Sequence, residues 1–137
     1  MEQLFMHWLA GVPPFLLYFV TAVALLVAFT VVYISLTPYH EIRLIQQGNA
    51  AAAASLAGAM LGFSLPLAHS VAQSANLADM ALWGVTAAIV QLATYFVVHL
   101  LIPSISRDIP EGRVAQGVFL GAVSVTTGIL NAACMTS

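Results

Sequence analysis

Three polar side chains follow one another at helical spacing inside a long apolar segment. Gln91, Tyr95 and His99 are separated by four residues each, a spacing that places them on one face of a helix. Polar side chains at membrane depth either hydrogen-bond to neighbouring helices or line a hydrated path. This face carries no carboxylate or ammonium group, and ion pathways usually include one. We therefore expect hydrogen bonds between helices here, with a polar path as the alternative.

The remaining chemistry-bearing residues do not form an enzyme site. Catalysis would need a nucleophile with a base, paired carboxylates or a metal cluster in a pocket. Glu41, Asp108 and Glu111 stand beside arginines in two short polar segments, where we expect solvated ion pairs or headgroup contacts. No two of the four histidines have the i, i+4 spacing of a helical metal site, and Cys134 is the only cysteine. We predict no enzyme, no cofactor and no metal site, and the small net charge of −2 indicates no nucleic-acid partner.

Four long uncharged segments must position these residues. Only 6% of the 137 residues are charged and 61% are hydrophobic, whereas a soluble domain carries about 25% charged residues. A bilayer core of about 30 Å needs roughly 20 helical residues, and segments 13–36, 49–71, 78–102 and 114–135 reach that length. Backbone groups in lipid must be satisfied within their own segment. We predict an all-α membrane protein with four transmembrane helices.

An internal repeat organises these helices. Shifts of 65 and then 64 residues bring matching residues together. Thr21 and Thr86 match inside the helices. The pairs in the loops are Pro38 with Pro103, Arg43 with Arg107, Ile45 with Ile109, and Gly48 with Gly112. Because each two-helix unit crosses the bilayer twice, both units begin on the same side and are parallel. We predict an interfacial segment at 1–12, a first two-helix repeat at 13–72 and a second at 73–137.

The three arginines predict the orientation. Arg43, Arg107 and Arg113 all lie in or beside the loops after the first and third helices, and basic loops are retained in the cytoplasm. The N- and C-termini would then be periplasmic. Two tryptophans near one membrane face and Tyr33 and Tyr39 near the other fit aromatic belts at the two interfaces.

Small residues recur at four-residue spacing in the second and fourth segments. Gly58 and Gly62 form one such pair, and Gly117 and Gly121 form the other. Faces of this kind let helix backbones approach closely. We expect packing within the bundle, and the alternative is that one face contacts a second copy in a homo-oligomer.

The loop pattern and the helix after it resemble a known family. A proline after the odd helix, then Arg-x-Ile-x-x-Gly, then the Ala- and Gly-rich stretch 48–62 resemble the YjfL-like inner-membrane family, a domain of unknown function numbered 350. The similarity covers nearly the whole chain. It implies a bacterial inner (cytoplasmic) membrane protein with a role near membrane stress or envelope modification, and it implies no catalytic residue.

Two functional hypotheses follow. The first is a non-enzymatic inner-membrane scaffold or interaction subunit that oligomerises and presents its arginine-bearing loops to a cytosolic or membrane-associated protein or to anionic lipid. The second is a small channel or transporter with a polar path along the third helix. A path requires the face of Gln91, Tyr95 and His99 to be wet, whereas a scaffold requires it to be dry and paired.

Overall fold

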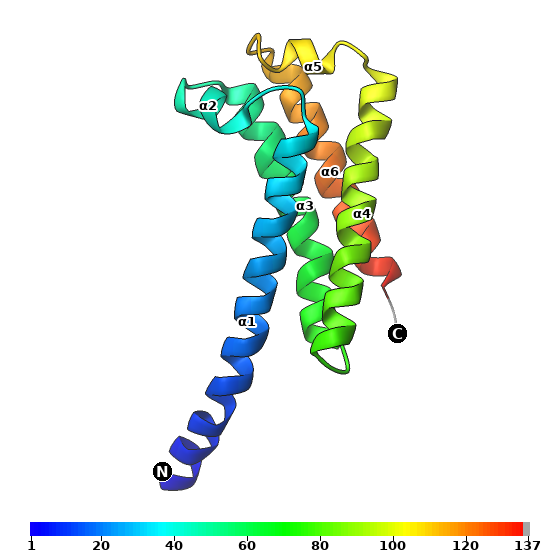
Figure 1. The fold of residues 1–137 in the computed structure, drawn as a ribbon. Helices are drawn as coiled ribbons and strands as arrows, with labels where there is room; N and C mark the ends of the chain where they lie inside the picture. Colours follow the sequence, from blue (N-terminus) through cyan, green and yellow to red (C-terminus); the bar gives the residue numbers. More distant parts are fainter. Residues whose placement is uncertain (136–137) are drawn as a thin grey trace.

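The computed structural model describes residues 1–135, and every regular element in that part of the chain is helical (Figure 1). Four of the helices are long and apolar enough to cross a membrane, which confirms the all-helical fold with four candidate transmembrane helices. Two short helices join them at one end. The elements in chain order are α1 (Glu2–Leu36), α2 (Glu41–Gln46), α3 (Ala50–Gln73), α4 (Leu77–Leu101), α5 (Ile105–Asp108) and α6 (Val114–Cys134).

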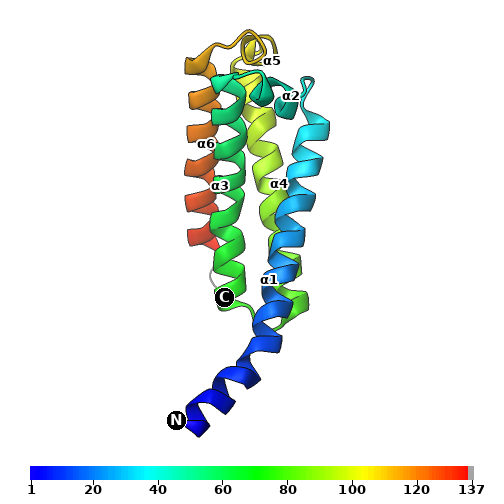
Figure 2. The same cartoon turned by 90° about the vertical axis from the view of Figure 1, so that its left-hand side faces the viewer.

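The first helix is longer than its predicted segment. We expected it to begin at residue 13, but it begins at Glu2 and continues through Pro13 and Pro14. The residues before the prolines are mostly apolar. If they were not helical, their backbone N–H and C=O groups would be unpaired in an apolar surrounding. That loss is larger than the loss of the helical hydrogen bonds that the two prolines cannot donate. At about 1.5 Å per residue, 35 residues extend about 52 Å. Figure 2 shows the dark blue N-terminal part of α1 bending away from the bundle. An interfacial position for residues 1–12 stays a prediction.

The two Ala- and Gly-rich helices, α3 and α6, form the closest helix pair. Gly117 near the start of α6 lies against Ala51 near the start of α3, and Gly128 lies against Gly62 further along both helices. Because the contact positions increase together, α3 and α6 run parallel. The hairpin partner α4 runs antiparallel to α3, and α1 packs on both α3 and α4.

The two polar loops lie at the same end of the bundle in both views (Figures 1 and 2). Each loop closes on a glycine with a positive φ angle, +84° at Gly48 and +81° at Gly112, a conformation that glycine adopts without steric cost. The Gly48 N–H donates to Ile45 O at 2.9 Å, and the Gly112 N–H donates to Ile109 O at 3.0 Å. The two turns therefore have matching backbone geometry; the duplication of the two-helix unit stays a prediction.

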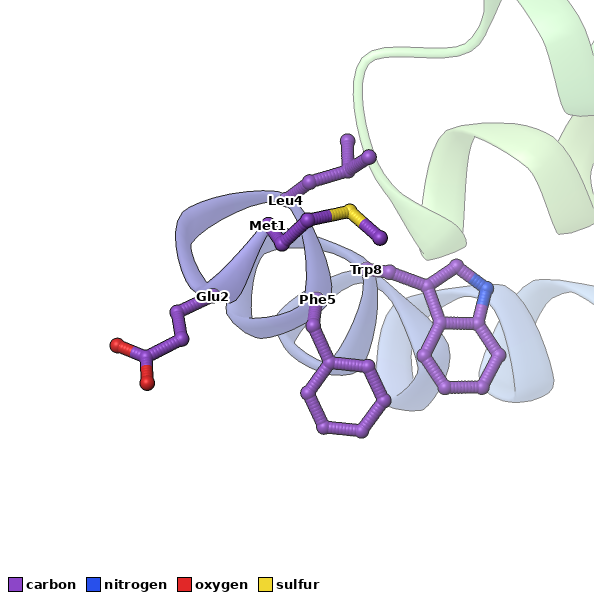
Figure 3. Close-up of a pocket in the computed structure, with 5 residues that line it drawn as sticks. All are labelled: Met1, Glu2, Leu4, Phe5 and Trp8. Carbon is purple, nitrogen blue, oxygen red and sulfur yellow. The ribbon is translucent and has the colours of Figure 1, made fainter.

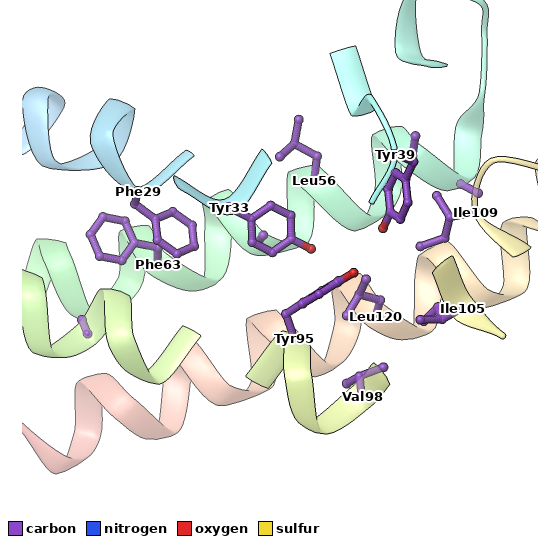
Figure 4. Packing of buried hydrophobic residues seen from close by; sticks show 14 of the residues in the cluster. Phe29, Tyr33, Tyr39, Leu56, Phe63, Tyr95, Val98, Ile105, Ile109 and Leu120 are labelled. Carbon is purple, nitrogen blue, oxygen red and sulfur yellow. The ribbon is translucent and has the colours of Figure 1, made fainter. Parts of the chain in front are cut away.

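The apolar surface of the bundle divides between an aromatic core and a lipid-facing exterior. Phe29 of α1 stacks on Phe63 of α3 with ring centroids 4.5 Å apart (Figure 4). Most large side chains of α1 remain exposed, and only 6% of its most apolar stretch is buried. In water such a surface would be unstable, so lipid must cover it.

Candidate functional site

The predicted polar face of α4 is packed against other helices over most of its length. Gln91 and Tyr95 are buried, and His99 is half-buried. The Gln91 side-chain amide donates a hydrogen bond to the carbonyl oxygen of Ser124 in α6 at 3.3 Å. Tyr95 meets Tyr33 of α1 edge to face at 5.6 Å and stacks on His99 at 6.2 Å. The face thus joins α4 to α6 and to α1 at separate levels.

Glu41 lies elsewhere than predicted. We expected a solvated carboxylate beside an arginine, but the residue is 0% exposed and has no ion pair within residues 1–135. The Thr37 hydroxyl donates to Glu41 Oε1 at 2.6 Å, while Oε2 has no hydrogen-bond partner in that part of the chain. The reason is that the connection after α1 folds back over the end of the bundle and turns the first residue of α2 inward. Burial raises the pKa of the Glu41 carboxyl, and the Thr37 hydrogen bond opposes that rise.

Two tyrosines expected in an aromatic belt are also inside the bundle. Tyr33 is 2% exposed and Tyr39 is 7% exposed, so neither faces a lipid interface. Their hydroxyl groups and that of Tyr95 turn toward a common region between α1, α3 and α4 (Figure 4). Burial raises the pKa of the Tyr39 phenol, the neighbouring phenols and carboxyl raise it further, and the Ser55 hydroxyl beside it acts in the opposite direction. Tyr33, Tyr39, Tyr95 and Glu41 are called the tyrosine–glutamate cluster below.

Sequence reasoning missed this cluster because its members come from three separate segments. Only one local signal pointed to it. Thr37 and Glu41 are four residues apart, a spacing that lets a hydroxyl reach a carboxylate within one turn of chain. Nothing in the local pattern shows that Tyr95, more than 50 residues later, packs against the same region.

The three arginines differ in their surroundings. All are exposed, and Arg113 lies 3.7 Å from a carboxylate oxygen of Asp108 and 3.5 Å from one of Glu111. Within residues 1–135, Arg43 and Arg107 form no ion pair. Both belong to the short helices at the same end of the bundle (Figure 1). This end therefore presents two guanidinium groups with no carboxylate from residues 1–135 to neutralise them.

The four glycines predicted to pack helices all lie at the contact between α3 and α6. A Cβ atom on Gly58 would overlap the backbone of Gly121, and one on Gly117 would overlap the backbone of Ala51. Gly62 meets the carbonyl of Ser124. Pro66, which lacks an N–H, leaves the carbonyl of Gly62 without its helical donor, and Gly128 fits against that carbonyl. These close contacts are made within one chain.

One large surface hollow lies on the first turns of α1 and has a mostly apolar lining. It is lined by Met1, Glu2, Leu4, Phe5 and Trp8 on the first turns of α1 (Figure 3). The Glu2 carboxylate points away from the two aromatic rings. All five side chains come from one exposed helix, so no second element closes the hollow. Within residues 1–135, no group of three or more histidine, cysteine or acidic side chains is placed to hold a metal ion.

Comparison with known proteins identifies the family. The family model described as Domain of Unknown Function (DUF350) matches residues 6–135. The chain belongs to the DUF350 family. This confirms the resemblance seen in the loop motifs.

Relatives of this DUF350 protein are membrane proteins by name. The chain is 35% identical over 131 residues to the UPF0719 inner membrane protein YjfL of Escherichia coli (strain K12), covering 96% of this chain and 99% of the relative. It is 33% identical over 118 residues to the UPF0719 transmembrane protein YshE of Bacillus subtilis (strain 168), covering 85% and 88%. No solved structure shows a significant match.

Proposed function

We propose that this DUF350 protein is a non-enzymatic scaffold of the bacterial inner membrane that uses Arg43 and Arg107 to bind anionic lipid headgroups at one membrane face. The supporting observation is that both guanidinium groups are exposed at one end of the bundle and form no ion pair within residues 1–135. Arginine binds phosphate oxygens through two parallel N–H donors, so a phosphodiester headgroup suits it chemically. The positive-inside rule makes this face cytoplasmic.

The neighbours of Arg43 favour lipid over a soluble protein as the bound group. Ile42, next to Arg43 on α2, is 50% exposed. An exposed isoleucine beside an exposed arginine is typical of a segment at the boundary between headgroups and acyl chains. The attraction between an anionic membrane surface and one nearby arginine contributes about 1 kcal/mol to the free energy of binding.

The packing of the α4 face favours the scaffold over the channel or transporter alternative. Gln91 and Tyr95 are 2% and 4% exposed and pack against α6 and α1, so this face is closed to a continuous water-filled path. Gln91 Oε1 and the Tyr95 hydroxyl have no hydrogen-bond partner within residues 1–135, but both atoms are buried. A conduit would need that face to be wet.

The proposed scaffold also self-associates and acts near membrane stress or envelope modification. The glycines at the α3–α6 contact are used within the chain, so a second copy would contact a lipid-facing surface such as that of α1. A cytosolic or membrane-associated protein remains a further partner at the arginine-bearing end.

Lipid retention after purification tests the proposal. The full chain is extracted from vesicles containing equal amounts of phosphatidylglycerol and phosphatidylcholine, and native mass spectrometry counts the lipids that remain bound. Replacing both Arg43 and Arg107 by glutamine should lower retention of phosphatidylglycerol selectively. Arg113→Gln is the matched control, because Arg113 is already paired with Asp108 and Glu111. Equal phosphatidylglycerol retention by the wild type and the double variant would overturn the proposal.

A further inference from the structure

The tyrosine–glutamate cluster contains four buried oxygen atoms without hydrogen-bond partners. They are the hydroxyls of Tyr33, Tyr39 and Tyr95 and Oε2 of Glu41, and none meets a partner within residues 1–135 in hydrogen-bonding geometry. The Ser55 hydroxyl lies near that of Tyr39, but it donates its proton to the Ala52 carbonyl. The four residues are between 0% and 7% exposed. Buried polar groups in folded proteins are nearly always hydrogen-bonded, so four unpaired oxygens around one region point to a bound polar group.

The charge of Glu41 has no counterpart in its surroundings. The chain has no lysine, and its three arginines are exposed. The groups around the carboxyl are neutral: Thr37 beside it, Tyr33 from α1, Tyr39 from the connection and Tyr95 from α4. His99 stacks on Tyr95, with ring centroids 6.2 Å apart. An ionised carboxylate is disfavoured in such a place, where the only donors are neutral: the Thr37 hydroxyl and the backbone N–H of Glu41 itself.

We propose that Glu41, Tyr33, Tyr39 and Tyr95 form a buried site that binds a proton and bridging water. The proton bonds to Oε2 and makes Glu41 a neutral carboxylic acid. That acid donates to a water molecule, which the phenol hydroxyls hold as donors and acceptors. Two to four polar partners are what a buried water molecule requires.

Glu41 is therefore a titratable group inside the bundle, whereas the sequence pattern predicted that it would be exposed to solvent. It links three separate parts of the chain, because its members lie on α1, on α4 and in the connection and helix that follow α1. Arg43 stands two residues after Glu41 and is exposed on the other side of α2. Loss of the proton would leave a buried charge beneath this exposed arginine.

Infrared spectroscopy of the full chain tests the proposal. A protonated carboxylic acid has a carbonyl-stretch band that a carboxylate lacks, and a detergent without ester groups keeps lipid carbonyls out of that region. At about pH 7 the wild type should show the band and Glu41→Gln should lack it. Glu41→Gln keeps the side-chain shape and an oxygen that accepts from Thr37, so the variant should fold. Glu111→Gln, at an exposed carboxylate, should retain the band.

Three outcomes would overturn the proposal. They are a wild type without the band at about pH 7, a band of undiminished intensity in Glu41→Gln, and a band frequency that does not change in Tyr95→Phe. The last variant removes one hydroxyl from the water-binding group, so it should shift the frequency of the acid without abolishing the band.

Discussion

The side-chain amide of Asn49 donates a hydrogen bond of 2.9 Å to the carbonyl oxygen of Ile109, and so joins the turn before α3 to the turn before α6. The same side chain caps α3, since its Oδ1 accepts from the Ala52 N–H at 3.0 Å. One residue therefore stabilises a helix start and holds the two arginine-bearing turns together.

Replacing Asn49 by alanine should destabilise the protein by about 2 kcal/mol. Roughly 1 kcal/mol comes from the lost cap and about as much from the hydrogen bond between the turns. Asn76→Ala, which removes only the cap of α4, should cost about 1 kcal/mol. Asn49→Asp should keep the cap but lose the donor to Ile109. Thermal unfolding in detergent measures all three, and equal losses for the two alanine variants would contradict the role of Asn49 between the turns.

Gly117→Ala should separate α3 from α6. The new methyl group would overlap the Ala51 backbone, which cannot rotate away as a side chain could. Overpacking of this kind costs about 1–3 kcal/mol. Gly11→Ala in α1 is the control, because no atom lies within 4 Å of the added carbon, and its unfolding temperature should stay the same or rise. Equal effects of the two substitutions would refute the close packing of these helices.

The stability of the protein should fall as pH rises above the ordinary range of a glutamate. Burial raises the pKa of Glu41 in the folded state, so the folded chain holds a proton that the unfolded chain has already released. The stability contribution is complete below the unfolded-state pKa and is lost as pH rises through the folded-state pKa. Glu41→Gln cannot titrate, so its unfolding temperature should lack this component of the pH dependence, whereas Glu111→Gln should follow the wild type. If the unfolding temperatures of Glu41→Gln and the wild type depended on pH in the same way, the raised pKa of Glu41 in the folded state would be contradicted.

Vesicles containing the protein should pass protons and ions no faster than empty vesicles. The Gln91 side chain is buried and bonded to the Ser124 carbonyl, so it offers no wet surface. A pH-sensitive dye inside the vesicles measures proton flux. Proton flux in the wild type that is abolished in Gln91→Leu would favour the channel or transporter instead. Gln73→Leu, at an exposed position, is the control and should leave any such flux unchanged.

Sequence alone was enough for the four membrane helices because hydrophobic length is a local property. It also located both glycine turns, where proline, arginine and glycine recur in the same order. The predicted start of α1 at residue 13 was wrong because prolines usually interrupt a helix, whereas α1 continues through Pro13 and Pro14. Glu41 and Tyr39 were misplaced because their burial depends on a connection folding back onto the bundle, and residue types within that connection do not encode what it will cover. Tyr33 was misplaced because it lies where α1 packs on α3 and α4, and it meets Tyr95 there.

The account depends most on the two arginine-bearing turns facing the same, cytoplasmic side of the membrane. In a Cys134→Ser background, single cysteines are placed at the exposed positions Gln47 and Glu111, and a third at Ala75 in the turn between α3 and α4. A membrane-impermeant maleimide is then applied to intact cells with a permeable outer membrane and to inside-out vesicles. The account predicts that positions 47 and 111 react only in the vesicles and position 75 only in the cells. Reaction of positions 47 and 111 from opposite sides would contradict it.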